Sequence, residues 1–173
     1  MYLCGKIRIK CMKKYILIAE EGERALIDKY LKLPQDEWEV VVTGVGAINV
    51  IRAAQTLPKD STILNIGYAG SANFEIGSVV RVQDSRLNHP HCGYTEPFQP
   101  LDTLPPQYLK VAHIDSVCYS GSDFVLESDF HDCVFDMELA YIAAFGFAKT
   151  YAIKVVSDNL SLHTYHQVTN GVE

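Results

Sequence analysis

The stretch FDMELAYIAAF, residues 135–145, is the most informative segment of the sequence. Its apolar pattern is typical of a buried helix, and we predict a helix over 136–148. Two carboxylates, Asp136 and Glu138, stand at its start, although an unpaired buried carboxylate costs on the order of several kcal/mol. Asp136 is explained by N-capping of this helix. Two interpretations of Glu138 remain open. It is either an anion stabilised by the helix dipole or a carboxylate that accepts hydrogen bonds from paired hydroxyl groups.

Outward from this segment, short β-branched runs alternate with helical ones. Strands are predicted at 14–20, 38–44, 61–67, 77–85, 111–121 and 150–158, and helices at 22–32 and 47–57. Strands interleaved with helices indicate a layered α/β domain, in which ligands usually lie beyond the carboxyl ends of the strands. The proline-rich segment 86–109 shows no period and is predicted to be a long functional or mobile excursion.

The size and composition of the chain indicate one globular domain. Its 173 residues are 48% hydrophobic and 21% charged. The sequence from Met12 is typical of a natural N-terminus. Residues 1–11 are therefore predicted to be a non-structural extension, and residues 12–173 are predicted to form a single domain. The net charge of -6 leaves no basic footprint for nucleic acid, and no apolar run is long enough for a membrane helix.

The cysteines and histidines predict neither disulfides nor a metal site. Five cysteines are scattered without a CxxC pair, a pattern typical of free thiols in a reducing cytoplasm. The histidine pairs His89/His91 and His163/His166 have no evident carboxylate or thiolate partners. The cysteines are Cys4, Cys11, Cys92, Cys118 and Cys133.

Three short segments at strand ends are candidates for chemistry. TGVGAIN (43–49) lacks both the third glycine of a dinucleotide loop and the Gly-Lys of a P-loop, which favours a tight turn. In IGYAGS, Gly67 and Gly70 permit either a plain turn or close approach of backbone amides to a ligand. Asp158 follows a β-branched strand, where it is either a general acid or a cap for the next helix.

The order of these segments resembles one family. AEEGE, TGVGAIN, NIGYAGS, SGSDFV, FDMELAYIAAF and VVSDN succeed one another as in the purine nucleoside phosphorylase/uridine phosphorylase superfamily. Within it the chain looks most like the 5′-methylthioadenosine/S-adenosylhomocysteine nucleosidases, over residues 14–160. The resemblance implies a three-layer α/β/α sandwich with a mixed, twisted central sheet. It also implies a cytoplasmic homo-oligomer of purine salvage that cleaves the N-glycosidic bond of a purine nucleoside or thionucleoside without a cofactor.

The resemblance further implies the roles of five residues in the reaction. Glu138 would bind the ribose 2′ and 3′ hydroxyls, with Met137 packed against the sugar. Asp158, with Ser157 beside it, would donate a proton to purine N7 as the glycosidic bond breaks. Glu23 would activate the attacking water. A protonated Asp158 and a basic Glu23 match the charges that develop on base and sugar during cleavage.

The base pocket is likewise implied by the resemblance. Phe124 would stack on the base, the backbone at Val125 would help to read it, and Ala69 and Gly70 would line the pocket. Tyr68 replaces the serine usual at its position, so its bulk is expected to fill part of the pocket. The short segment SDFHDCVFD (128–136) and a chain some tens of residues shorter than usual also predict a remodelled pocket.

Two alternatives to hydrolysis remain open from the sequence. The phosphorylases of the superfamily carry Arg-x-Gly-Ser where this chain has Asn65 to Tyr68, and the missing arginine removes a bidentate phosphate ligand. Hydrolysis is therefore expected. A phosphorylase would need inorganic phosphate as co-substrate and another arginine, with Arg52, Arg81 and Arg86 as candidates. A catalytically silent nucleoside-binding protein is the second alternative.

Overall fold

The computed structural model describes residues 12–88 and 97–170. The predicted extension at residues 1–11 therefore lies outside the described residues. So do His89 and His91, together with Cys4, Cys11 and Cys92. The remaining cysteines, Cys118 and Cys133, are buried free thiols.

The apolar runs form one mixed sheet of eight strands in the described part of the chain. Strands β1, β2, β3 and β8 pair in parallel, whereas β4 runs antiparallel to β8. The strands are β1 (Lys14–Ile18), β2 (Trp38–Val42), β3 (Thr62–Gly70), β4 (Val79–Leu87), β5 (Gln99–Pro100), β6 (Ile114–Ser120), β7 (Cys133–Asp136) and β8 (Lys149–Asp158).

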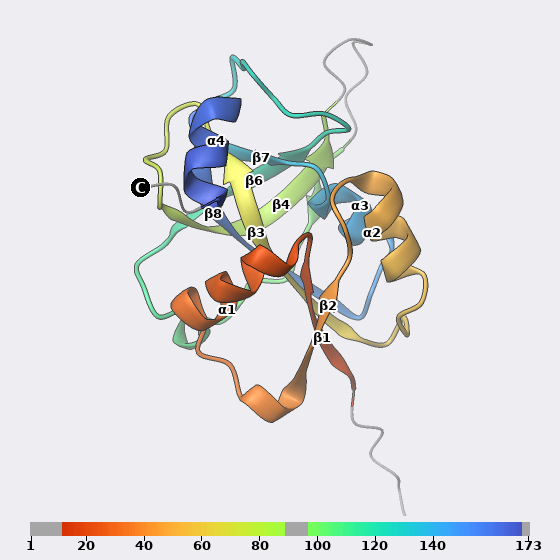
Figure 1. Cartoon of the computed structure of the whole chain (residues 1–173). Coiled ribbons are helices and arrows are strands. Elements are labelled where there is room, and N and C mark those ends of the chain that lie inside the picture. The colour runs from red at the N-terminus through yellow and green to blue at the C-terminus, as the bar shows by residue number, and fades with distance from the viewer. Residues whose placement is uncertain (1–11, 89–96, 171–173) are drawn as a thin grey trace, which may run out of the picture.

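The sheet closes on itself, a feature that the sequence patterns did not predict. Its strand order is β2-β1-β3-β7-β6-β4-β5, and β8 pairs with both β3 and β4. Strands β3, β7, β6, β4 and β8 therefore form a ring, which a single pair, Gly70 with Phe135, completes between β3 and β7. This closure brings the carboxyl ends of β3, β7 and β8 to one rim (Figure 1).

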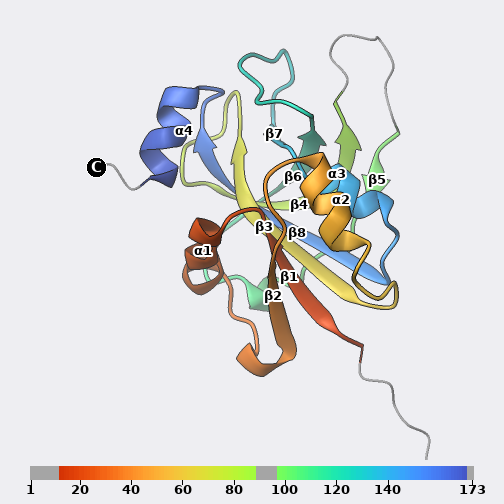
Figure 2. The ribbon, with the colours of Figure 1, turned by 45° about the vertical axis from the view of Figure 1, so that its right-hand side comes forward.

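Helices cover both faces of the sheet, as Figures 1 and 2 show. Helices α1 (Arg24–Tyr30) and α4 (Leu162–Thr169) lie on one side, and α2 (Ala47–Ala54) and α3 (Leu139–Ala144) on the other. Short 3-10 turns occur at Glu21–Glu23, Gln35–Glu37 and Pro106–Tyr108. The predicted α/β/α layering around a mixed sheet is confirmed. No helix in the described ranges has the length and apolar character needed to cross a membrane.

The helix predicted over 136–148 is observed only as α3, Leu139–Ala144, so both predicted boundaries are wrong. Phe135 and Asp136 finish β7, where Asp136 pairs with Ser120 of β6, and α3 begins only at Leu139. Asp136 is therefore not the N-cap residue; Glu138 takes that position, without a side-chain capping bond. The cause is the buried ion pair between Asp136 and Lys154, which holds Asp136 within the sheet.

Other boundaries differ less from the predicted ones. Strand β3 continues to Gly70 because β8 pairs with it over that whole length, so the expected loop after 67 begins later. Helix α2 stops at Ala54 instead of residue 57. The described part of the excursion 86–109 holds the end of β4, the short β5 and one 3-10 turn.

Candidate active site

A pocket lies at the rim where the carboxyl ends of β1, β3, β7 and β8 meet. The structure brings all ten predicted site residues to its walls. They are Glu23, Tyr68, Ala69, Gly70, Phe124, Val125, Met137, Glu138, Ser157 and Asp158.

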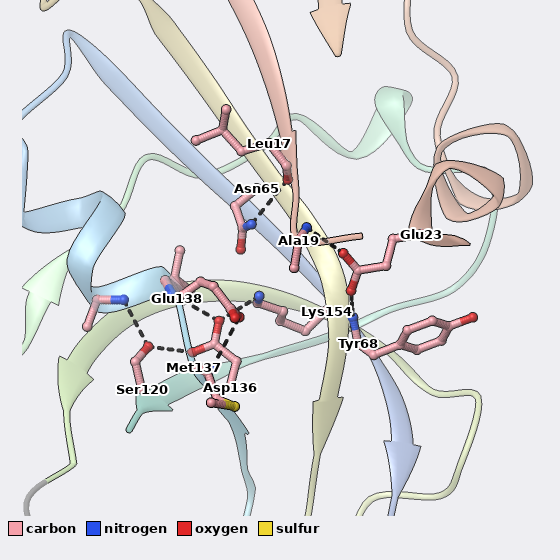
Figure 3. A network of polar contacts seen from close by, with 12 residues as sticks. Leu17, Ala19, Glu23, Asn65, Tyr68, Ser120, Asp136, Met137, Glu138 and Lys154 are labelled. Carbon is pink, nitrogen blue, oxygen red and sulfur yellow. Dashed lines mark hydrogen bonds and ion pairs between the residues drawn. The ribbon is translucent and has the colours of Figure 1, made fainter. Parts of the chain in front are cut away.

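Glu23 is held by the backbone around it. It ends the 3-10 turn after β1 and is only 8% exposed. One carboxylate oxygen accepts the N–H of Ala19 at 2.7 Å, and the other accepts the N–H of Tyr68 at 2.9 Å (Figure 3). A Cβ at Gly67 would lie 2.7 Å from Oε1 of Glu23, so the glycine in β3 makes room for this carboxylate.

Glu138 lies in the turn between β7 and α3 and is also 8% exposed. Its Oε1 accepts the N–H of Gly46 at 2.7 Å, and Gly46 has a φ of 86°, a conformation that favours glycine. Burial, aided by the negative charge of Asp136, raises the pKa of Glu138 to about 7, although Lys154 and the Gly46 N–H oppose the shift. This carboxyl group therefore changes charge near neutral pH.

Asp158 is the last residue of β8 and is buried. Ser157 donates a hydrogen bond to its Oδ2 at 2.7 Å, and the N–H of Ser161 donates to its Oδ1 at 3.3 Å. Burial raises the pKa of Asp158 above its ordinary value, against these hydrogen bonds. The N-cap of α4 is Ser161, so capping is not the whole explanation of Asp158. A Cβ at Gly70 would lie 2.8 Å from its Oδ1.

Aromatic side chains form another wall of the pocket. Phe124, in the loop after β6, meets Tyr165 of α4 edge to face, with 5.5 Å between the ring centroids. Val125 follows Phe124 along the same wall. Sequence reasoning missed Tyr165, because the short polar helix that carries it shows only a weak periodic pattern. Burial, reinforced by nearby carboxylates, raises the pKa of Tyr165 to about 12, so its phenol stays protonated.

Tyr68 lines the pocket, but its ring extends away from Glu138 and Asp136 (Figure 3). The ring packs against the hydrophobic cluster beneath α1, which includes Leu26 and Tyr30. Tyr68 therefore contributes both to the wall of the pocket and to that cluster.

A buried charge network lies next to Glu138, and the sequence motifs did not reveal it. Lys154 of β8 is 1% exposed, and its Nζ lies 2.6 Å from Oδ2 of Asp136. Ser120 donates a hydrogen bond to the other oxygen of Asp136 (Figure 3). A single lysine inside the apolar run AIKVVS was the available signal, because a charged residue in a central strand needs a buried partner.

The pocket is strongly acidic. Its lining contains six carboxylates and no lysine or arginine. The six are Glu20, Glu23, Asp123, Asp136, Glu138 and Asp158. Over residues 12–88 and 97–170, no group of three or more His, Cys, Asp or Glu side chains is arranged to hold a metal ion.

The arginines considered for phosphate binding are not among the residues that line the pocket. Arg81 forms a bidentate pair with Asp115 on the outside of the sheet. Arg86 lies between the rings of Phe98 and Tyr119. Arg52 is in the last turn of α2.

Comparisons with known proteins identify the fold. No family model and no curated protein matches the chain. A 5′-methylthioadenosine/S-adenosylhomocysteine nucleosidase from Neisseria meningitidis, solved with methylthio-immucillin-A, matches with a TM-score of 0.73 at 17% identity, over 91% of each chain. The nucleosidase from Colwellia psychrerythraea, in complex with adenine, has a TM-score of 0.70 at 17% identity, over 91% of this chain and 88% of that one.

A futalosine hydrolase from Helicobacter pylori is similar to the same degree. Its TM-score is 0.69 at 16% identity, over 93% of this chain and 92% of that one. The chain therefore has the fold of the methylthioadenosine/S-adenosylhomocysteine nucleosidases. The fold implied by the order of its sequence segments is confirmed.

Replacing Glu138 by Gln is expected to stabilise the unliganded protein in a pH-dependent way. The folded-state pKa of Glu138 is raised to about 7, so the stability that its bound proton contributes is lost as pH rises through that value. Gln cannot ionise. The free energy of unfolding of Glu138→Gln should therefore exceed that of the wild type by an amount that grows from about pH 4.5 and reaches about 1–3 kcal/mol at pH 8.

Urea unfolding at pH 4.5 and pH 8 measures this difference directly. Glu127→Gln, at an exposed position in the loop after β6, controls for loss of one negative charge. Equal free-energy differences between wild type and Glu138→Gln at the two pH values would contradict the raised pKa.

Proposed function

We propose that this chain hydrolyses the N-glycosidic bond of a purine nucleoside or thionucleoside. The observation that carries the proposal is the convergence of Glu23, Glu138 and Asp158 on one pocket from distant parts of the sequence. Each carboxylate is buried and each has its own set of donors, so their protonation states can differ. The fold shared with nucleosidases supports this assignment.

The three carboxylates fit the charge changes of the reaction. Cleavage leaves positive charge on the ribose and negative charge on the departing base. Burial raises the pKa of Asp158, a shift in the direction that suits its proposed role as proton donor to N7 of the base. Glu23, held by the backbone N–H groups of Ala19, Glu20 and Tyr68, orients and deprotonates a water at the anomeric carbon. Glu138 accepts the ribose hydroxyls.

The remaining walls suit a nucleoside. The ring of Phe124 provides a surface on which the base can stack, and the backbone of Val125 provides polar groups beside it. Met137 packs against the sugar. The chemistry needs no cofactor, because proton transfer and an activated water suffice for hydrolysis.

The charge of the pocket favours water over phosphate as the attacking group. Inorganic phosphate is an anion at neutral pH, and the described lining of the pocket offers acidic side chains and no lysine or arginine to bind it. Arg81, one of the arginines considered for phosphate, is already paired with Asp115. The described lining of the pocket therefore lacks the anion site that a phosphorylase would need.

We further propose that the chain acts as a homo-oligomer in the cytoplasm, in purine salvage. Exposed apolar side chains run from the end of β2 into α2, and Ile48 is 67% exposed. Val45 belongs both to this surface and to the wall of the pocket. A second copy packed here would bury the apolar surface and complete the pocket mouth. The surface consists of Val42, Val45, Ile48 and Ile51.

Release of free base should not depend on phosphate. We expect methylthioadenosine or inosine to give base at the same rate with and without phosphate, as measured by chromatography. Asp158→Asn should lower kcat by about 100-fold or more, since it removes the proton donor. Asp129→Asn, outside the pocket, is the control.

Other outcomes assign the chain differently. Base release only in the presence of phosphate would identify a phosphorylase. Nucleoside binding without turnover would identify a silent binding protein. Unchanged hydrolysis by Asp158→Asn would rule out Asp158 as the general acid.

Gly67→Ala should impair catalysis with little effect on the fold. Its Cβ would press on Oε1 of Glu23 at 2.7 Å and turn that carboxylate away from the water it activates. We expect kcat to fall about 10-fold or more, because misplaced catalytic groups lose rate steeply. Gly22→Ala is the matched control, since a Cβ there meets nothing within 4 Å. Equal kcat for the two variants would contradict the assigned role of Glu23.

Ile48→Lys should dissociate the proposed oligomer. A charge on the exposed face of α2 would oppose burial of that surface. Sedimentation velocity should show a shift from oligomer to monomer, with unchanged far-UV circular dichroism. A wild-type protein that is already monomeric at micromolar concentration would contradict the interface.

A further inference from the structure

Lys154 is a charged residue in the middle of a buried strand. Its ammonium group lies 2.6 Å from Asp136, whose side chain is equally buried (Figure 3). Its neighbours Ile153 and Val155 belong to the hydrophobic core. A buried ion pair is seldom better for stability than apolar residues of similar volume. Stability alone therefore does not explain why this strand contains a lysine.

The pair controls the turn before α3. Oδ2 of Asp136 accepts the N–H of Leu139 at 3.0 Å, and Ser120 Oγ, which donates to Asp136, accepts the N–H of Ala140 at 2.8 Å. These are the first two N–H groups of α3. The Glu138 side chain makes no capping bond of its own. The position of this turn thus depends on the side chain of Asp136.

The same pair sets the charge around Glu138. Burial raises the pKa of Glu138, Asp136 adds to the rise, and Lys154 opposes it. Burial works against the charge on Lys154, but nearby carboxylates raise its pKa above the ordinary value, so the ammonium stays charged near neutral pH.

The other titratable groups beside this cluster do not replace that positive charge. Glu23 adds a further negative charge that raises the pKa of Glu138. The pKa values of Tyr141 and Tyr165 are raised, first by burial, so both phenols are neutral near pH 7. Burial also raises the pKa of the Cys118 thiol well above its ordinary value.

We propose that Lys154 is a positioning residue of the site: through Asp136 it fixes the turn that carries Glu138 and keeps Glu138 a carboxylate. The inference rests on the proposed function, because it concerns how Glu138 meets the ribose. A carboxylate accepts hydrogen bonds from both hydroxyls, whereas a protonated carboxyl replaces one acceptor by a donor. Loss of Lys154 would therefore weaken recognition of the hydroxyls specifically.

The test compares adenosine with 2′,3′-dideoxyadenosine, which lacks both hydroxyls. Calorimetry between pH 6 and 9, on protein carrying Asp158→Asn so that neither ligand is cleaved, gives the ratio of the two Kd values. With Lys154 present, adenosine should be preferred above about pH 7, and the preference should decline below it.

Lys154→Met should lower the preference for adenosine at least 10-fold at pH 7.5 and move its decline to higher pH. Lys154→Arg, which keeps the positive charge, should retain the wild-type preference for adenosine and its wild-type pH dependence. Lys149→Met removes an exposed lysine from the same strand and should change neither. A folded Lys154→Met protein with the original preference and the original pH dependence would overturn the proposal.

A second variant covers the case in which Lys154→Met does not fold. Lys154→Met combined with Asp136→Leu removes both members of the buried ion pair. The two removed charges act in opposite directions on the pKa of Glu138, so this double variant tests the positioning of the turn. Loss of the adenosine preference supports that positioning, and its retention overturns it.

The controls also separate this inference from the proposed function. If the protein carrying only Asp158→Asn binds neither nucleoside, the proposed function fails and the inference fails with it. If it binds both equally at every pH, nucleoside binding stands, but the roles of Glu138 and Lys154 toward the ribose are overturned.

Discussion

The structure around the pocket depends on the cost of burying carboxylates. Glu23, Glu138 and Asp158 are all nearly removed from solvent, and each is compensated by nearby hydrogen-bond donors. These donors require backbone to approach closely, which explains Gly46 with its positive φ and Gly67 beneath Glu23. Backbone N–H groups of both glycine segments, TGVGAIN and IGYAGS, therefore bind carboxylates of the protein itself.

Much of the architecture could be predicted from local sequence, and the failures have a common cause. Apolar runs located six of the eight strands in the described residues, whereas the short β5 and β7 were not predicted. The helix at 136–148 was mispredicted because Asp136 is tied to Lys154, eighteen residues later in the chain, which no local pattern shows. Closure of the sheet was missed for the same reason, since β8 pairs with two strands at once. Long-range partners, and not propensity, decide these points.

The positions of the site residues followed from the order of weak motifs taken together. Glu138 and Asp158 were each ambiguous alone, yet the fold places both on one pocket with Glu23. Tyr165 and Lys154 were missed because their importance lies in what surrounds them. The six lining carboxylates were likewise not evident from a modest net charge of -6, because they are spread along the chain. These features agree with the proposed function, hydrolysis of an uncharged nucleoside.

A crystal structure of Asp158→Asn with a bound purine nucleoside would test the role of Glu138 most directly. We expect the ribose 2′ and 3′ hydroxyls to contact the Glu138 carboxylate and the base to lie against Phe124. We also expect N7 beside residue 158 and a water between Glu23 and the anomeric carbon. A nucleoside bound elsewhere, or bound here with its hydroxyls away from Glu138, would contradict the proposed function of the pocket.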